Sequence, residues 1–391
     1  MLDLTHMLAG PYGAMLLADL GAETIKVEPP GKGEGTRGLL AGDPANSFKG
    51  MGAYFLTLNR NKRSVCLDLK SPRGLELFYR LVERADVVFD NFSFGVTRRL
   101  KIDHDALAAV NPRIITCSVT GFGETGPDPQ RPAFDQVIQG MGGGMSITGY
   151  PDGGPLRAGI PIGDLGGGLF GAIGVLAALA ARERTGRGQH VDISMLDCQI
   201  SLLNYMATMY FLSGVNPEPL GNGHFVHVPY NTFRTQTQHI IIAVVFDSFW
   251  ESFLEVIDVP ALRDPKYKTQ PGRYADRVRI NAIIEETLAA QPAEHWLAAL
   301  QAKRIPCAPV NNFEQALNDT QIRHRHMVVN VSHPQGGEVP MPGNPVKLSE
   351  TYEDTYTAPP LLGQHTDEVL TELAGLDLRE IGELRAAGVI G

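Results

Sequence analysis

Strand-like and helix-like segments alternate along the first 120 residues, and this alternation limits the chain to few folds. Short apolar runs predict strands over residues 2–5, 24–28, 64–69, 87–92 and 114–119. Apolar residues at helical spacing predict helices over 11–21 and 72–85. Strands that alternate with helices form a parallel sheet with both faces covered. Ligands bind such sheets beyond the carboxyl ends of the strands, which selects the loops 6–11, 91–95 and 120–126.

A second region with its own strand and helices begins near Leu220. A β-branched run predicts a strand over residues 239–245, and apolar spacing predicts helices over 248–257, 281–290 and 293–302. Since the chain has 391 residues, it is long enough for two or three domains. We expect this region to form a smaller α/β domain of about 100 residues.

The segment 165–181 is the most apolar part of the chain and carries no charge over 17 residues. That length is the short limit for a membrane span. Five of its residues are glycine, and Asp164 and Arg182 flank it, so we expect a closely packed helix within the protein. The chain does not open on a basic region followed by an apolar one. We therefore expect a soluble, cytoplasmic protein without a membrane partner.

The charge balance argues against nucleic-acid binding. The chain has 34 Lys and Arg residues against 43 Asp and Glu residues, a formal net charge of −9, whereas nucleic-acid-binding proteins normally present a basic face. The eleven histidines show no metal-binding spacing, so we expect no metal site. The four cysteines lie too far apart in the sequence for a disulfide or zinc framework: Cys66, Cys117, Cys198 and Cys307.

Asp164 is the most informative single residue, because glycines surround it at the start of the apolar helix. It could cap the helix, or its carboxylate could attack an activated acyl group while the glycines let a ligand approach. The sequence GGGLFG at 166–171 matches a dinucleotide fingerprint formally, but no clear strand precedes it. Glycines that allow close helix packing are the favoured interpretation there.

Basic residues gather in the N-terminal half near one strand end, at Asn91 and Phe92. These residues could hold a phosphorylated ligand, or they could be ordinary solvated surface: Arg37, Lys62, Arg63, Lys70, Arg98 and Arg99. His224 lies in a glycine-rich turn before the second domain, where it could contact a carboxylate or simply form the turn.

Four motifs resemble the family III CoA-transferases, also called the CaiB/BaiF family: LDLTHMLAGPYG (2–13), DNFSFG (90–95), PIGDLGGG (161–168) and RTGRGQHVDISM (184–195). The resemblance covers the chain from end to end and implies an enzyme that moves coenzyme A from an acyl-CoA to a free carboxylic acid. CoA would be a substrate, and no tightly bound cofactor or metal would be needed. Asp164 falls on the nucleophilic aspartate of the family, which forms an acyl anhydride and then a CoA thioester.

The resemblance also implies CoA-contacting positions: Leu8, Ala9, Arg37, Leu67, Asp68, Lys70, Asn91, Phe92, Arg99 and Arg131. Leu8 stands where formyl-CoA transferase has glutamine, which argues against formyl or oxalyl specificity. The implied fold is a large Rossmann-like parallel-sheet domain (1–200), a small α/β domain (215–310) and a C-terminal return to the large domain (311–391). Two chains would form an interlocked homodimer.

Two alternatives share the resemblance. A racemase of the same fold uses a histidine where this chain has Phe134, and phenylalanine cannot exchange a proton. A non-catalytic CoA-binding protein would not need the intact Asp164 motif.

The segments GNGHFVHVPYNTF (221–233) and PPLLGQHT (359–366) are similar to the succinate–hydroxymethylglutarate branch. We therefore expect succinyl-CoA as donor and a C4–C6 dicarboxylate as acceptor, with His224 or a nearby arginine holding the distal carboxylate.

Overall fold

The computed structural model describes residues 1–351 and 354–391 and separates into two compact units. Unit 1 contains Met1–Met145, Arg157–Val215 and Gln321–Gly391, and unit 2 contains Ser146–Leu156 and Asn216–Thr320. Two segments differ from the expected division: 311–320 lies in unit 2 and not in the C-terminal return to the large domain, and 146–156 lies in unit 2 and not in the large domain. The segment 146–156 belongs to unit 2 because the Gly221 amide donates a hydrogen bond to the Gly149 carbonyl at 2.8 Å, and the Tyr150 ring packs directly against Gly221.

Unit 1 is built on a parallel sheet of six strands in the order β5-β2-β1-β6-β7-β8. The strands are β1 (Leu2–Asp3), β2 (Thr24–Glu28), β5 (Lys62–Cys66), β6 (Val87–Asp90), β7 (Ile115–Thr120) and β8 (His190–Ser194). The predicted α/β class with a large parallel sheet is confirmed. Since the chain leaves β1 toward β2 on one side and resumes at β6 on the other, the topology reverses between β1 and β6.

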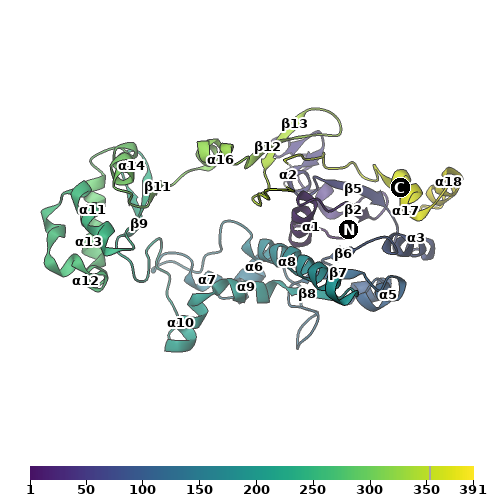
Figure 1. The fold of residues 1–391 in the computed structure, drawn as a ribbon, viewed down its shortest axis with the longest axis horizontal. Coiled ribbons are helices and arrows are strands. Elements are labelled where there is room, and N and C mark those ends of the chain that lie inside the picture. Colours follow the sequence, from purple (N-terminus) through teal and green to yellow (C-terminus); the bar gives the residue numbers. More distant parts are fainter. Residues whose placement is uncertain (352–353) are drawn as a thin grey trace. The chain divides into compact units, whose positions relative to one another are not determined.

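Helices cover both faces of this sheet (Figure 1). Val88 faces a core shared with α3 (Pro72–Val82), α5 (His104–Val110), α17 (Thr366–Ala374) and α18 (Leu378–Ala386). Its neighbours Val87 and Phe89 face a second core with α1 (Ala9–Asp19), α6 (Asp135–Met141) and α8 (Ile162–Thr185). Successive strand residues point to opposite faces, so two buried faces require the continuous apolar runs seen in the sequence.

The remaining elements of unit 1 are short. They are η1 (Gly35–Arg37), β3 (Ser47–Phe48), β4 (Met51–Gly52), α2 (Ala53–Leu58), α4 (Val96–Leu100), α9 (Met195–Leu203), α10 (Tyr205–Ser213), β12 (Val328–Ser332) and β13 (Glu338–Pro342). Two further helices, α7 (Gly144–Ile147) and α16 (Thr320–His324), lie at the division between the units.

Helices α1 and α8 pack closely because glycines replace side chains at their contact. A Cβ atom on Gly168 would lie 2.5 Å from the Ala9 carbonyl oxygen, and one on Gly13 would lie 2.6 Å from the Gly168 oxygen. Backbone at those distances leaves no room for a side chain. The interpretation of the 166–171 glycines as packing residues is confirmed at Gly168.

Helix α8 is buried on one side only. It is the one described helix with the length and apolar composition of a membrane span, although core helices of soluble proteins share these properties. The single chain leaves Ile173 and Leu176 of α8 exposed, together with Ile200 of α9 and Phe211 and Leu212 of α10. The expectation of a fully packed helix therefore holds for the side that faces the sheet and not for the other side.

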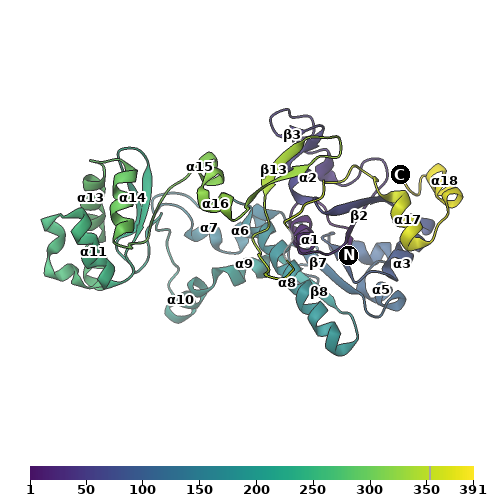
Figure 2. The ribbon, with the colours of Figure 1, turned by 45° about the horizontal axis from the view of Figure 1, so that its top comes forward.

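Unit 2 has its own sheet and its own core (Figure 2). The antiparallel sheet has the order β11-β10-β9, with β9 (Tyr230–Arg234), β10 (His239–Ala243) and β11 (Cys307–Pro309). The other elements are α11 (Asp247–Ile257), η2 (Pro260–Arg263), η3 (Pro265–Lys268), α12 (Gln270–Ala275), α13 (Arg277–Leu288), α14 (Ala293–Ala302) and α15 (Phe313–Asn318). Trp250, Phe253 and Trp296 fill the core with strand residues.

Candidate active site

The reversal of strand order between β1 and β6 forms the crevice in which sheets of this kind bind ligands. Asn91, directly after β6, connects the loop that follows β6 with the loop that follows β1. Its Nδ2 donates to the His6 carbonyl and its Oδ1 accepts from the His6 amide, each at 2.8 Å. The His6 and Phe92 rings lie 5.4 Å apart. Leu8 and Ala9 follow at the start of α1. The structure therefore brings four of the predicted ligand-contacting residues to one place.

The Asp90 carboxylate stabilises the loop that follows β6 by hydrogen bonds. Its Oδ1 accepts a hydrogen bond from the Phe92 amide at 3.1 Å, and its Oδ2 accepts one from the Ser118 hydroxyl at 2.8 Å. Burial is the main cause that raises the pKa of Asp90 to about 6. Sequence reasoning did not single out this residue, because an aspartate at a strand end has many other uses.

The segment after β5 ends at the same edge of the sheet. Leu67 is buried and pairs with Ile390 from the C-terminal end of the chain. The Asp68 carboxylate accepts a hydrogen bond from the Lys70 amide at 3.0 Å, and Lys70 itself is exposed. The C-terminal segment thus supports this predicted contact loop.

The basic residues divide into those already paired and those free for a ligand. Lys62 is buried, and its Nζ lies 2.8 Å from an Asp3 carboxylate oxygen. Arg63 forms ion pairs with the carboxylates of Glu23, Glu368 and Glu372. Arg99 and Arg131 are exposed and form no ion pair with any described residue. They remain candidates for phosphate groups.

Arg37 is fully engaged within the protein. Its Nε and Nη2 donate to the two oxygens of Glu28 at 2.6 and 2.7 Å, and its Nη1 donates to the Pro360 carbonyl at 3.1 Å. Its guanidinium lies 3.9 Å from the centre of the Phe55 ring. A phosphate contact at Arg37 would have to displace these partners, so its predicted ligand role stays a prediction with this geometry against it.

Asp164 lies in the first turn of α8 but does not cap it. The capping position belongs to Pro161, and the free amides of Gly163 and Asp164 donate instead to Oδ1 of Asp135, at 2.9 and 3.4 Å. The capping interpretation of Asp164 is therefore wrong. No residue in the described part of the chain donates a hydrogen bond to the Asp164 carboxylate, which leaves both oxygens available for chemistry.

Asp135 is the residue that sequence reasoning missed. It begins α6, and Gln139 one turn later donates to its Oδ2 at 2.8 Å. The Gln139 Oε1 accepts in turn from the Ala158 amide at 2.9 Å. Asp135 and Asp164 are 29 positions apart, and no local spacing rule connects residues at that separation.

Burial and then the negative charge of Asp135 raise the pKa of Asp164 to about 7. A carboxylate at a helix N-terminus is normally stabilised by the helix dipole, so burial and like charge outweigh the dipole here. Near neutral pH the group exists in both protonation states. A partly desolvated carboxylate without hydrogen-bond partners is the arrangement expected of a nucleophile.

The glycines around Asp164 are explained by the protein itself. A Cβ on Gly163 would lie 3.1 Å from Asp135, and one on Gly167 would lie 2.9 Å from the Met195 side chain. The structure shows a packing role for these glycines, and their role in admitting a ligand stays a prediction. They let α8 approach its neighbours and so place Asp164.

Phe134 occupies the position at which the racemase alternative requires a histidine. It is the residue before α6 and its side chain is 70% exposed. The neighbouring Asp135 accepts hydrogen bonds from the first amides of α8, and a phenylalanine side chain cannot exchange a proton.

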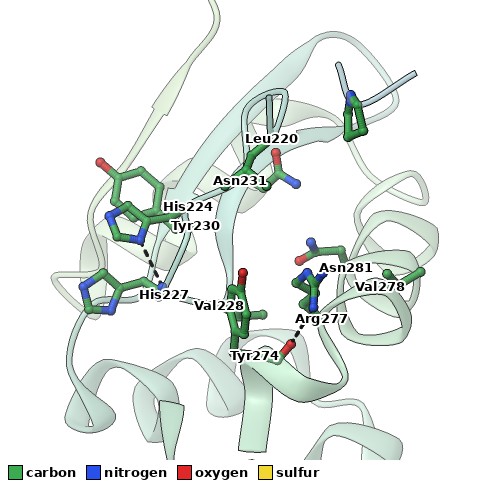
Figure 3. Close-up of a pocket in the computed structure, with 12 residues that line it drawn as sticks. Leu220, His224, His227, Val228, Tyr230, Asn231, Tyr274, Arg277, Val278 and Asn281 are labelled. Carbon is green, nitrogen blue, oxygen red and sulfur yellow. Dashed lines mark hydrogen bonds between the residues drawn. The ribbon is translucent and has the colours of Figure 1, made fainter. Parts of the chain in front are cut away.

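His224 lies in unit 2, in the loop before β9. Its Nδ1 accepts hydrogen bonds from the Val226 and His227 amides at 3.0 and 3.1 Å, and its ring stacks on Tyr230 at 5.0 Å between ring centres (Figure 3). Burial and His227 lower its pKa. The imidazole is therefore neutral at pH 7, and its single ring donor is Nε2–H.

Comparison with known proteins agrees with the resemblance in the motifs. A family model described as CoA-transferase family III matches residues 1–366. The chain is 39% identical over 362 residues to acetyl-CoA:oxalate CoA-transferase of Acetobacter aceti, covering 92% of this chain and 90% of that protein. It is 35% identical over 391 residues to succinyl-CoA:glutarate CoA-transferase of Homo sapiens, covering 100% and 88%. It is 39% identical over 385 residues to succinyl-CoA:mesaconate CoA-transferase of Haloarcula marismortui, covering 96% and 95%.

Solved structures agree with the sequence comparison. A CaiB/BaiF family protein from Brucella suis matches with a TM-score of 0.85 at 36% identity, covering 95% of this chain and 97% of that one. Parallel sheet, family model and full-length relatives converge on one conclusion: this chain belongs to CoA-transferase family III and is a CoA-transferase.

Proposed function

We propose that the enzyme transfers CoA from succinyl-CoA to a C4–C6 dicarboxylic acid, with Asp164 as the nucleophile. The single observation that carries the chemistry is the Asp164 carboxylate, which is partly buried, held by the backbone of α8 and free of hydrogen-bond partners among the described residues. Relatives named for succinyl-CoA with glutarate or mesaconate support the substrate class.

In the first half-reaction, an Asp164 oxygen attacks the thioester carbonyl of succinyl-CoA. The C–S bond breaks, which gives an aspartyl–succinyl anhydride and CoA thiolate. The thiolate then attacks the aspartyl carbonyl of the anhydride. This step forms an enzyme-bound aspartyl-CoA thioester and releases succinate.

In the second half-reaction, a carboxylate of the acceptor attacks the aspartyl-CoA thioester and releases the thiolate again. The thiolate attacks the acceptor carbonyl of the new anhydride, which yields the new acyl-CoA and restores Asp164. Over the full cycle one thioester is converted into another and one free carboxylate into another, so the cycle needs no net proton, oxidant or external energy source.

The crevice between β1 and β6 is the proposed CoA site. It would use the residues of the surrounding loops: Leu8, Ala9, Leu67, Asp68, Lys70, Asn91 and Phe92. Arg99 and Arg131 would attract the phosphate groups, because both are exposed cations without an acidic partner among the described residues.

We also propose that the working unit is a homodimer. The exposed apolar side chains of α8, α9 and α10 are what an unpaired chain would show if a second copy covered them. The interlocked form implied by the family resemblance is part of this proposal.

Incubation with succinyl-CoA and a panel of acids tests the substrate class. The panel contains glutarate, itaconate, malate, citramalate and mesaconate, with oxalate and acetate as comparisons, and mass spectrometry detects each new acyl-CoA. We expect transfer to several C4–C6 dicarboxylates. Transfer to oxalate alone, or to no dicarboxylate, would contradict the substrate proposal.

Trapping tests the mechanism. Hydroxylamine converts an aspartyl thioester into a hydroxamate, so enzyme treated with succinyl-CoA and hydroxylamine should carry this modification at Asp164. Modification at another residue, or none during full turnover, would contradict the proposed intermediate.

A further inference from the structure

Unit 2 contains a cavity of about 250 Å³ between β9, α12 and α13. Its polar walls are formed by His224, Tyr230, Asn231, Tyr274, Arg277 and Asn281. In Figure 3, Tyr274 and Asn281 point toward the same space from two sides, and the stacked rings of His224 and Tyr230 lie on a third. The sequence analysis named only His224 from this group, with an unspecified nearby arginine as the alternative.

The side chains that line this cavity include basic groups and no acidic ones. Arg277 is the one Lys or Arg among the residues that line it, His224 and His227 are the two histidines, and no Asp or Glu belongs to the lining. Arg277 donates to the Tyr274 carbonyl at 3.3 Å and lies 4.6 Å from the centre of the Tyr274 ring. No described acidic side chain forms an ion pair with it. An arginine without an acidic partner, beside an aromatic ring, retains donors for an anion.

Two asparagine side chains that line the same cavity have polar atoms without a hydrogen-bond partner among the described residues. The Oδ1 atom of Asn281 is buried and has no hydrogen-bond partner. Since no described residue orients this amide, it can present its NH₂ group to a ligand. Asn231 also lines the cavity, and its Oδ1 accepts from the Thr232 amide at 2.9 Å, which leaves its NH₂ group without an acceptor among the described residues. Buried polar atoms without partners are uncommon and call for an explanation.

Arg277 and Asn281 lie one turn apart on α13, so they act from the same helix face. His224 cannot supply the charge, because its Nδ1 accepts two backbone hydrogen bonds and its ring is neutral at pH 7. It can add only Nε2–H and an aromatic wall. The permanently charged group among the lining residues is therefore the guanidinium of Arg277, and His227 is a second imidazole in the lining.

We propose that this cavity binds a carboxylate of a short dicarboxylic acid, with Arg277 as the charged contact and Asn281 as the neutral one. An arginine guanidinium matches a carboxylate with two parallel hydrogen bonds. This inference rests on the proposed function for the identity of the acid, and it names the residues that would separate dicarboxylic from monocarboxylic acceptors.

The test compares Arg277→Gln with Arg279→Gln, a neighbour on α13 that is exposed like Arg277 but does not line the cavity. The readout is kcat/KM for glutarate and for valerate, its monocarboxylic counterpart of equal length, with succinyl-CoA as donor. Arg277→Gln should lower kcat/KM for glutarate about 10- to 100-fold, the loss expected for a hydrogen bond to a charged group. The value for valerate should change by less than about twofold, and Arg277→Lys should recover part of the loss.

A binding measurement gives a second readout on the free enzyme. Glutarate should raise the melting temperature of the wild type and of Arg279→Gln, but not that of Arg277→Gln. Equal losses for glutarate and valerate, or a normal response of Arg277→Gln to glutarate, would overturn the proposal. If the wild type transfers CoA to no dicarboxylate, the proposed function itself fails. If the wild type does so and Arg277→Gln is normal, only this inference fails.

Discussion

The Asp164 carboxylate must be charged to attack a thioester, yet its surroundings favour the neutral form. Burial and the charge of Asp135 raise its pKa to about 7, while its amide and that of Gly163 are satisfied by Asp135. Asp135 thus does two things at once: it completes the first turn of α8, and it makes Asp164 harder to ionise. Each role gives a separate prediction.

Loss of the nucleophile should abolish transfer without abolishing CoA binding. We expect Asp164→Ala and Asp164→Asn to lower kcat by more than about 10³-fold, a typical loss for a residue that acts in covalent catalysis. CoA binding, measured by calorimetry, should stay within a few-fold of the wild type, since the proposed contacts lie on other loops. Near-normal turnover in either variant would show that Asp164 is not the nucleophile.

The pH dependence follows from the same pKa. The rate constant kcat/KM for succinyl-CoA, which reports free-enzyme groups, should rise through about pH 7 as Asp164 ionises. Asp135→Asn keeps the Oδ1 acceptor for the α8 amides and removes the charge, so this rise should shift to lower pH. Asp135→Ala also removes the cap and should cost about 1 kcal/mol of unfolding free energy. An unchanged pH profile in Asp135→Asn would contradict the assigned role of its charge.

Asp164 should also make the folded protein less stable as pH rises. Its folded pKa lies above the unfolded value of 3.8, so between these two values the folded state binds more protons and loses stability with increasing pH. Asp164→Asn should therefore melt at a higher temperature than the wild type at pH 8, with the difference shrinking toward pH 4. A difference that is constant across this range would mean that Asp164 has an ordinary pKa.

At the scale of elements, the contact of α1 with α8 connects the two halves of the proposed site. Helix α1 begins at Ala9 in the crevice loop, and α8 carries Asp164 in its first turn. Gly13 and Gly168 allow these backbones to approach. The distance between the proposed CoA-binding loop and the proposed nucleophile therefore depends on two residues without side chains.

Gly168→Ala should destabilise the protein by about 1–3 kcal/mol, as expected for a methyl group forced into a packed contact. The Cβ would lie 2.5 Å from the Ala9 carbonyl, so we also expect a higher KM for acyl-CoA as this loop shifts. Gly382→Ala on α18 is the matched control, because no atom lies within 4 Å of the added Cβ. The control should be neutral or stabilised by up to about 1 kcal/mol. Equal effects of both variants in denaturant titrations would contradict the packing argument.

At the scale of the whole molecule, the exposed apolar side chains of α8, α9 and α10 indicate the surface that a second copy of the chain would cover in the proposed dimer. Leu212 is 84% exposed in the single chain, and Leu378 on α18 is 78% exposed. If the chain worked alone, lysine at either position would change stability by less than about 0.5 kcal/mol. If a second copy buries α10, the two positions behave differently.

We expect light scattering to give the mass of two chains, and Leu212→Lys to lower the melting temperature or the dimer fraction strongly. Leu378→Lys should leave both unchanged. An interlocked dimer has a further property: folded dimers that carry different tags should not form hybrids on mixing, but should do so after unfolding and refolding together. A monomeric mass, or equal behaviour of the two lysine variants, would contradict the dimer.

Local sequence patterns predicted the bounds of an element well where the residues of that one segment determine its structure. The strand 24–28 has the predicted bounds, and helix 293–302 matches α14. Residues 195–213 form two helices, because Asn204, whose φ is 50°, ends α9 and starts α10. The predicted helix 281–290 instead begins at Arg277, because apolar spacing detects the buried stripe and not the polar first turn.

The sequence by itself determined the fold class, and it predicted the edge of the sheet for the ligand and Asp164 as the residue to examine. These follow from alternation, strand ends and motif, which are local properties. Only the tertiary structure decided that Asp135 caps α8, that Arg37 is already paired with Glu28, and that Arg277 stands without an acidic partner in a cavity. Charge, burial and pairing depend on groups distant in the sequence, and only the folded chain brings those groups within hydrogen-bonding distance.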